Sequence, residues 1–133
     1  MPGASPAIKR KIKVTGDQHK RYIKMIFKIE NAQKVEKNGF TAYVYNNKNE
    51  YPTLNTVYVD CFENHEKVYV KNSHRLYFVI EGEGEFNVGD NKYSVKQKDV
   101  ILIEPMTKYS YKGKMKLFEI NYPATNSDDE VKI

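Results

Sequence analysis

Apolar and polar residues alternate in short runs through the middle of the chain, from residue 25 to residue 122. A period of two is typical of strands with one buried face, whereas helices repeat apolar positions every three to four residues. The only helical candidate, Glu30 to Lys37, is short and ends at Asn38-Gly39. Runs rich in β-branched and aromatic residues lie at 41–45, 56–62, 67–71, 76–80, 92–95, 99–103 and 116–120.

Residues with turn chemistry separate these runs, among them Asn46-Asn47, Gly89-Asp90 and Lys112-Gly113. Gly82 and Gly84 interrupt a further run and indicate a tight bend. Many short strands at regular spacing are typical of antiparallel sandwiches and barrels. We therefore predict one all-β domain over residues 25–122.

Two motifs between His74 and Tyr111 add a resemblance. The first, EGEGEF, runs from Glu81 to Phe86 at the end of a predicted strand, and the second, DVILIEP, runs from Asp99 to Pro105. They resemble the end of motif 1 and motif 2 of the cupin superfamily, in particular its small, single-domain, type-2-like members. The resemblance implies a jelly-roll β-barrel, an antiparallel double-sheet sandwich, that is commonly dimeric and holds a metal ion or a small ligand in its lumen.

The chain departs from cupin motif 1 at the positions that bind the metal. Alignment on the glycine that ends the motif puts Arg75 at the family's glutamate position. With three intervening residues the two histidine positions hold Tyr69 and Lys71, and with four they hold Val68 and Val70. Lysine and arginine are cations without a lone pair for a metal. We therefore expect no metal and no cofactor in the barrel.

Motif 2 departs in the same way, because Tyr109 stands where the family's third histidine falls. The histidines of the chain do not rebuild the site. Strand parity sends His74 to the face opposite Arg75, and His65 lies in a predicted turn, so we expect both on the surface or rim.

The resemblance implies that the motif 1 glutamate position faces inward, so Arg75 and Tyr77 should line the lumen, where Tyr109 meets them. Tyr69 and Lys71 share the parity of Arg75 and are expected to join them as ligand-binding residues. Tyrosines present flat apolar faces and hydroxyl groups, which suit sugars and other polar rings. Tyrosines that only pack in strands remain the alternative.

A buried guanidinium is costly unless an anion pairs with it. That anion is either an internal carboxylate, with Glu119 and Asp60 as candidates, or an anionic ligand, whose carboxylate or phosphate an arginine fork can bind in a bidentate way. The sequence leaves both a structural and a ligand-binding role of Arg75 open.

Nucleophilic catalysis has no support, since no GxSxG motif is present and Cys61, the only cysteine, lies in an apolar strand. We interpret the protein as a metal-independent cupin that binds a small organic anion or carbohydrate without catalysis. The alternative is a metal-independent sugar (nucleotide) isomerase or epimerase. Tyr109 would be its acid and Lys71 its base, because no inward-facing histidine is predicted.

Charge and composition change this interpretation only at the ends of the chain. The protein has 133 residues and a net charge of +5, but residues 1–24 hold seven basic residues and one acidic residue. This extension is either disordered or swapped as a strand with a second subunit, and alternatively contacts nucleic acid. The basic residues proposed for that contact are Lys9, Arg10, Lys11, Lys13, Lys20 and Arg21.

The last segment, residues 123–133, is polar and acidic, and we expect a tail that does not pack. No apolar run approaches the roughly 18 residues of a membrane span, and no secretory leader is evident. With a single cysteine, these features favour a cytoplasmic location. Exposed strand edges and an apolar outer sheet face favour a homodimer.

Overall fold

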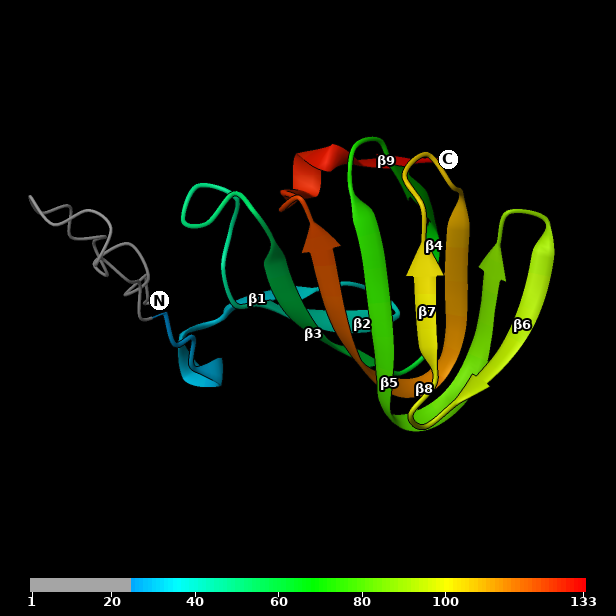
Figure 1. Cartoon of the computed structure of the whole chain (residues 1–133). Coiled ribbons are helices and arrows are strands. Elements are labelled where there is room, and N and C mark those ends of the chain that lie inside the picture. The colour runs from blue at the N-terminus through cyan, green and yellow to red at the C-terminus, as the bar shows by residue number, and fades with distance from the viewer. Residues whose placement is uncertain (1–24) are drawn as a thin grey trace, which may run out of the picture.

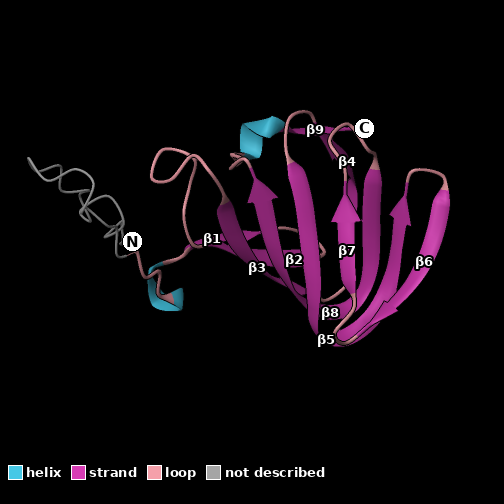
Figure 2. Ribbon diagram, in the orientation of Figure 1, coloured by secondary structure: helices cyan, strands magenta, loops and turns pink. Residues whose placement is uncertain are grey.

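The computed structural model describes residues 25–133, which form an all-β domain (Figures 1 and 2). The predictions for residues 1–24 lie outside the described residues. Within 25–133 no helix is long or apolar enough to cross a membrane. The elements are η2 (Ile29–Asn31), β1 (Gln33–Glu36), β2 (Phe40–Val44), β3 (Asn55–Cys61), β4 (Asn64–Val70), β5 (His74–Val88), β6 (Asn91–Lys96), β7 (Val100–Ile103), β8 (Tyr109–Tyr122), η3 (Ser127–Asp129) and β9 (Glu130–Lys132).

All strand pairs are antiparallel. The sheet curls round on itself (Figure 1), and buried side chains fill its interior. One path through it runs β1-β2-β3-β8-β4-β9, while β5 pairs with β6, β7 and β8. The two long strands β5 and β8 therefore belong to both walls. The all-β prediction and the barrel-like architecture are confirmed.

The predicted bend lies in β5 at Gly82, just after the pairing of β5 with β8 shifts register between Val79 and Glu81. Gly82 has φ +91°, and a Cβ atom there would lie 2.1 Å from the carbonyl oxygen of Lys114. Only glycine adopts this backbone conformation and this close approach without strain. The bend lets one pair of strands serve both walls of the barrel.

Because successive side chains of a strand point to opposite faces, every second residue of a strand can point into the core. In β3 every second residue is buried, from Asn55 to Cys61, and in β8 Met115 and Leu117 are buried opposite them. Cys61 is a core residue, as predicted, and burial raises the pKa of its thiol to about 11.

The helical candidate Glu30 to Lys37 does not form a helix over its length. Only η2 is helical, and β1 instead pairs with β2 in a hairpin, with Val35 opposite Ala42. Val35 is the single apolar residue of β1, so this strand carries too weak a pattern for the sequence to distinguish it from a helical turn.

The expectation of an unpacked tail after residue 122 is wrong. Residues 123–133 cross one end of the barrel, where β9 pairs with β4 (Figure 1). Polar contacts hold the segment: the Thr125 amide donates to Asn55 Oδ1 at 2.8 Å, and Lys48 Nζ lies 2.8 Å from Asp129 Oδ2. Backbone pairing and polar contacts do not require the apolar pattern that signals a strand in a sequence.

Candidate functional site

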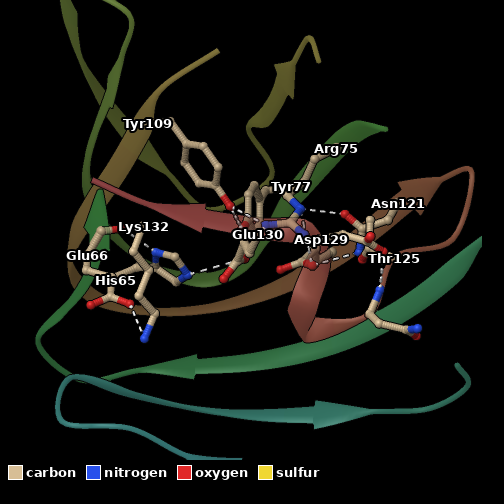
Figure 3. A network of polar contacts seen from close by, with 12 residues as sticks. His65, Glu66, Arg75, Tyr77, Tyr109, Asn121, Thr125, Asp129, Glu130 and Lys132 are labelled. Atoms are coloured by element: carbon tan, nitrogen blue, oxygen red, sulfur yellow. Dashed lines mark hydrogen bonds and ion pairs between the residues drawn. The ribbon is translucent and has the colours of Figure 1, made fainter. Parts of the chain in front are cut away.

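Arg75 lies inside the barrel, as predicted, with its side chain 4% exposed (Figure 3). It is on β5 opposite Asn121 of β8, whose side-chain oxygen accepts a hydrogen bond from Arg75 Nε. Its Nη1 donates to the Tyr109 hydroxyl at 2.7 Å and to Glu130 Oε2 at 2.6 Å. Side chains from both ends of β8 and from β9 thus meet at one guanidinium of β5.

The internal carboxylate predicted for Arg75 is Glu119, not Asp60. Glu119 Oε2 lies 3.4 Å from Arg75 Nε and accepts a hydrogen bond of 2.8 Å from the Asn121 amide. Asp60 has the opposite parity in β3 and is half-exposed. Burial alone would lower the pKa of Arg75, but Glu119, the phenols and Glu130 together hold it well above its usual value. Arg75 is therefore a permanent cation.

Three tyrosines with almost no exposed surface pack together in the lumen: Tyr77, Tyr109 and Tyr111. Of these, Tyr109 is bonded to Arg75. The hydroxyls of Tyr77 and Tyr109 are 2.6 Å apart, whereas the Tyr111 hydroxyl is buried and has no hydrogen-bond partner among residues 25–133. Burial raises the pKa of each phenol. They stay protonated at neutral pH and can donate protons or hydrogen bonds. The inward placement of Tyr77 and Tyr109 agrees with the sequence prediction.

His65 was expected on the surface or rim, and the structure places it inside. Its side chain is 6% exposed and its ring lies between those of Phe40 and Tyr111, with centroids 4.7 and 4.9 Å away. The turn predicted around His65 is instead the start of β4, and the pairing of β4 with β8 shifts by one residue between His65 and Val68. The extra residue lets both side chains point inward, which alternation alone forbids.

Hydrogen bonding sets the orientation of the His65 ring. Nδ1 lies 2.7 Å from the carbonyl oxygen of Glu66, so Nδ1 carries a proton and donates. Nε2 then faces the lumen, 4.0 Å from Glu130 Oε2. The ring of His65 also lies stacked near that of Tyr109, with centroids 5.8 Å apart. His74, in contrast, is exposed at the rim beside Glu104, as predicted.

Tyr69 and Lys71 do not join the lumen, so that prediction is wrong. β4 buries Val68 and Val70, which corresponds to four intervening residues in motif 1 rather than three. Tyr69 is half-buried opposite Val131 of β9. Lys71 is exposed in the turn before β5, beside an outer cavity of about 380 Å³.

The sequence missed Glu130 as well as His65. Glu130 stands in the polar segment that carried no packing signal, and it reaches Arg75 only because β9 pairs with β4. Among residues 25–133 no group of three or more histidine, cysteine, aspartate or glutamate side chains is arranged to hold a metal ion. The polar centre of the lumen is the cation of Arg75, which is held by Glu119 and Glu130. Tyr77, Tyr109 and the imidazole of His65 lie around it (Figure 3).

Several solved structures share this architecture. The nucleoside dehydratase Pac13 is 24% identical with a TM-score of 0.76, over 83% of this chain and 91% of that one. The chain has the cupin fold. Streptomyces PAC13 has also been solved with uridine as variants in which a tyrosine is replaced by phenylalanine or a histidine by glutamine, at 23–24% identity.

More distant cupin-fold structures also match. KdgF from a Halomonas species is 13% identical with a TM-score of 0.67, over 79% of this chain and 97% of that one. A variant of the oxalate decarboxylase OxdC from Bacillus subtilis is 12% identical with a TM-score of 0.71, over 80% of this chain and 32% of that one. No protein-family model and no curated protein matches the sequence.

Proposed function

We propose that this cupin binds a small polar ring compound, of the nucleoside or sugar type, in its lumen and moves protons on it without a metal. The observation that carries the proposal is that His65 faces inward beside the phenol of Tyr109. It supplies the base for which the sequence predicted no inward-facing histidine. The similar fold of a nucleoside dehydratase, solved with uridine as tyrosine and histidine variants, supports the same chemistry.

His65 has the features of a general base. Its Nδ1–H is committed to the Glu66 carbonyl, so the neutral ring has its lone pair on Nε2, toward the lumen. The aromatic rings on both sides, Phe40 and Tyr111, hold the imidazole plane in place. A base that is oriented before the ligand arrives needs little rearrangement in the reaction.

Tyr109 has the features of a general acid. Burial keeps its phenol protonated, while Arg75, at 2.7 Å, opposes that shift and stabilises the phenolate formed when the proton leaves. In a dehydration, His65 takes a proton from carbon and Tyr109 gives one to the departing hydroxyl group, which leaves as water. In an isomerisation the same pair moves a proton between neighbouring atoms. Lys71, exposed outside the lumen, has no part in either reaction.

The aromatic walls suit a ring-shaped ligand. The rings of Phe86 and Tyr111 stack with centroids 4.7 Å apart, and Tyr77 meets the ring of Phe86 at a tilt. These rings are buried against one another, so a sugar or base stacks on them where it parts them, and the polar groups around it then set its orientation. The unpaired hydroxyl of Tyr111 is a further group for a ligand to bind.

The test is binding and turnover with uridine, uridine 5′-monophosphate, glucose and glucuronate, measured by calorimetry and proton NMR. We expect at least one compound to bind. Tyr109→Phe and His65→Gln should keep binding within about tenfold but lower turnover by about 10²- to 10⁴-fold, because each removes one proton-transfer group.

Matched controls use the exposed counterparts Tyr93→Phe and His74→Gln, which should behave as the wild type. If none of the four compounds binds, or if the lumen variants behave like their controls, the proposed function is wrong. Binding with no turnover in the wild type would leave the non-catalytic interpretation, with the lumen as a receptor site.

We also propose that the protein forms a homodimer through the outer face of β5 and β7. Phe78 on β5 and Val100 and Leu102 on β7 are exposed, and β7 pairs only with β5 among the described strands. An uncharged apolar face at a strand edge suits a second copy of itself, because a self-complementary contact covers both copies at once.

A further inference from the structure

We infer that Glu130 occupies the place of an acidic group of the ligand, so that a carboxylate or phosphate displaces it from Arg75 when residues 126–133 open. The inference rests on the proposed function and adds the charge of the ligand and the route by which it enters. Residues 126–133, which comprise η3 and β9, are called the C-terminal lid below.

Arg75 has its structural counterion without the lid. Glu119 and Asn121 come from the long central strand β8, are buried, and together engage Nε of the guanidinium. The positive charge of Arg75 is already balanced by the carboxylate of Glu119. Glu130 is a second carboxylate on the same cation, so it adds one negative charge that the barrel does not need for neutrality.

Glu130 binds the part of Arg75 that faces the end of the barrel crossed by the lid. Its Oε2 accepts from Nη1 at 2.6 Å, and the same Nη1 donates to the Tyr109 hydroxyl. Its side chain is 25% exposed, whereas that of Glu119 is 11% exposed. When Glu130 leaves, Arg75 Nη1 loses a carboxylate partner next to the proposed acid, and an incoming anion restores both the hydrogen bond and the charge.

The C-terminal lid is held by contacts that are weak in water. None of residues 126–133 is buried, and β9 is a three-residue strand that pairs with β4 alone among the described strands. Apart from the bond of Glu130 to Arg75, its ion pairs Lys48–Asp129 and Lys132–Glu66 lie at the surface, where such pairs stabilise little. Segments of this kind open locally at a small fraction of the free energy of global unfolding.

The lid also has a defined hinge and free space beside it. The chain is anchored just before the lid, where the buried Thr125 donates its amide to Asn55 Oδ1. A cavity of about 380 Å³ lies against η3 and β9, lined in part by Lys71, Asp128 and Val131. Movement about residue 125 therefore disturbs no core side chain. In the alternative, Glu130 would only stabilise the fold and would not compete with a ligand for Arg75.

The first test neutralises Glu130 and compares ligands that differ by one acidic group. The probes are uridine 5′-monophosphate against uridine and glucuronate against glucose, which separate phosphate from carboxylate recognition. In Glu130→Gln we expect the affinity for the anionic member of at least one pair to rise at least tenfold, because the internal competitor has lost its charge. Affinity for the neutral member should change less than threefold. Asp128→Asn, an exposed neutralisation in the same lid, should change neither.

The second test locks the lid reversibly. Tyr69 and Val131 are directly paired between β4 and β9, and directly opposed residues of antiparallel strands are about 4.5–5.5 Å apart, a separation that a disulfide spans. The double variant Tyr69→Cys, Val131→Cys should lose binding of the anion at least tenfold when oxidised and regain it in dithiothreitol. Native Cys61 is buried, with its thiol pKa raised to about 11, and stays out of the exchange.

The outcomes separate the inference from the proposed function. If the wild type binds uridine or glucose but both Glu130→Gln and the oxidised disulfide leave all affinities unchanged, the inference about the lid is wrong and the proposed function is retained. If the wild type and Glu130→Gln bind none of the four probes, both fall together. If Glu130→Gln only lowers the unfolding midpoint and gains no affinity for anions, Glu130 is a structural plug.

Discussion

At the scale of single residues, Arg75 organises the interior of the barrel. Its guanidinium joins β5, β8 and the C-terminal segment through Asn121, Glu119, Tyr109 and Glu130. A buried ion pair adds little to net stability. Removing one partner is nevertheless costly, because the remaining charge is then left without compensation.

This asymmetry gives a testable prediction for Arg75→Met. The substitution leaves the buried carboxylate of Glu119 unpaired, so we expect it to lower the free energy of unfolding by about 3–5 kcal/mol. Adding Glu119→Gln removes the stranded charge and should recover at least half of the loss. Urea unfolding followed by circular dichroism measures both values. A loss below about 1 kcal/mol, or no recovery in the double variant, would show that Arg75 is not the charge centre of the barrel.

Single residues were predictable wherever strand parity held. Parity within β5 places Arg75 and Tyr77 on one face, and the resemblance to cupin motif 2 adds Tyr109. Parity was not applied to His65, because it stood in a predicted turn. That segment is instead the start of β4, where a one-residue shift in the pairing with β8 lets His65 point inward. Parity failed at Lys71 because two motif spacings were open and only the three-dimensional register decides between them.

At the scale of elements, the bend of β5 is where backbone geometry matters most. Gly82 combines a positive φ with a close approach to the Lys114 carbonyl, whereas Gly89, also at positive φ, has open space where a Cβ atom would lie. The two glycines therefore separate the cost of backbone strain from the cost of a steric clash.

We predict that Gly82→Ala destabilises the protein far more than Gly89→Ala. Both substitutions strain a left-handed backbone at about 1–2 kcal/mol, but only the methyl group added at Gly82 would also push β5 away from β8. The difference in unfolding midpoint should be evident in a thermal melt monitored by circular dichroism. Equal effects of the two substitutions would mean that the bend tolerates a Cβ atom and that the register shift has another cause.

Elements with strong patterns were predictable and polar elements were not. The apolar alternation of β3 and β8 indicates their burial, while β1 and β9 carry few apolar residues and form because neighbouring strands offer free backbone groups. The same reasoning explains why Glu130 was missed. A carboxylate in a polar segment is expected to be solvated until a strand pairing carries it to Arg75.

At the scale of the whole molecule, the outer sheet face is the largest feature without a role in the lumen. Leu102 is 70% exposed and Val100 is 54% exposed on the edge strand β7. We expect the protein to have twice its chain mass of 15.6 kDa in solution at micromolar concentration. Leu102→Glu should convert it to a monomer, because a charge in an apolar contact is left without a partner.

Light scattering coupled to gel filtration measures this mass directly. Tyr93→Glu, on the exposed side of β6, is the matched control and should leave the mass unchanged. A monomeric wild type, or a Leu102→Glu variant that remains dimeric, would contradict the proposed interface. The lumen would be unaffected by either result, since the two faces of β5 are separate.

The proposed chemistry depends on the barrel lumen, between His65, Tyr109 and Arg75, being a ligand site. NMR of the histidine side chains, recorded during titration with uridine, uridine 5′-monophosphate, glucose and glucuronate, reports on this site without any need for turnover. We predict that at least one compound shifts the ring signals of His65 together with the amides of Tyr77 and Tyr109, while the exposed ring of His74 is unmoved. If the His65 signals stay in place with all four compounds, or if the shifts are confined to the outer surface, the lumen is not the ligand site.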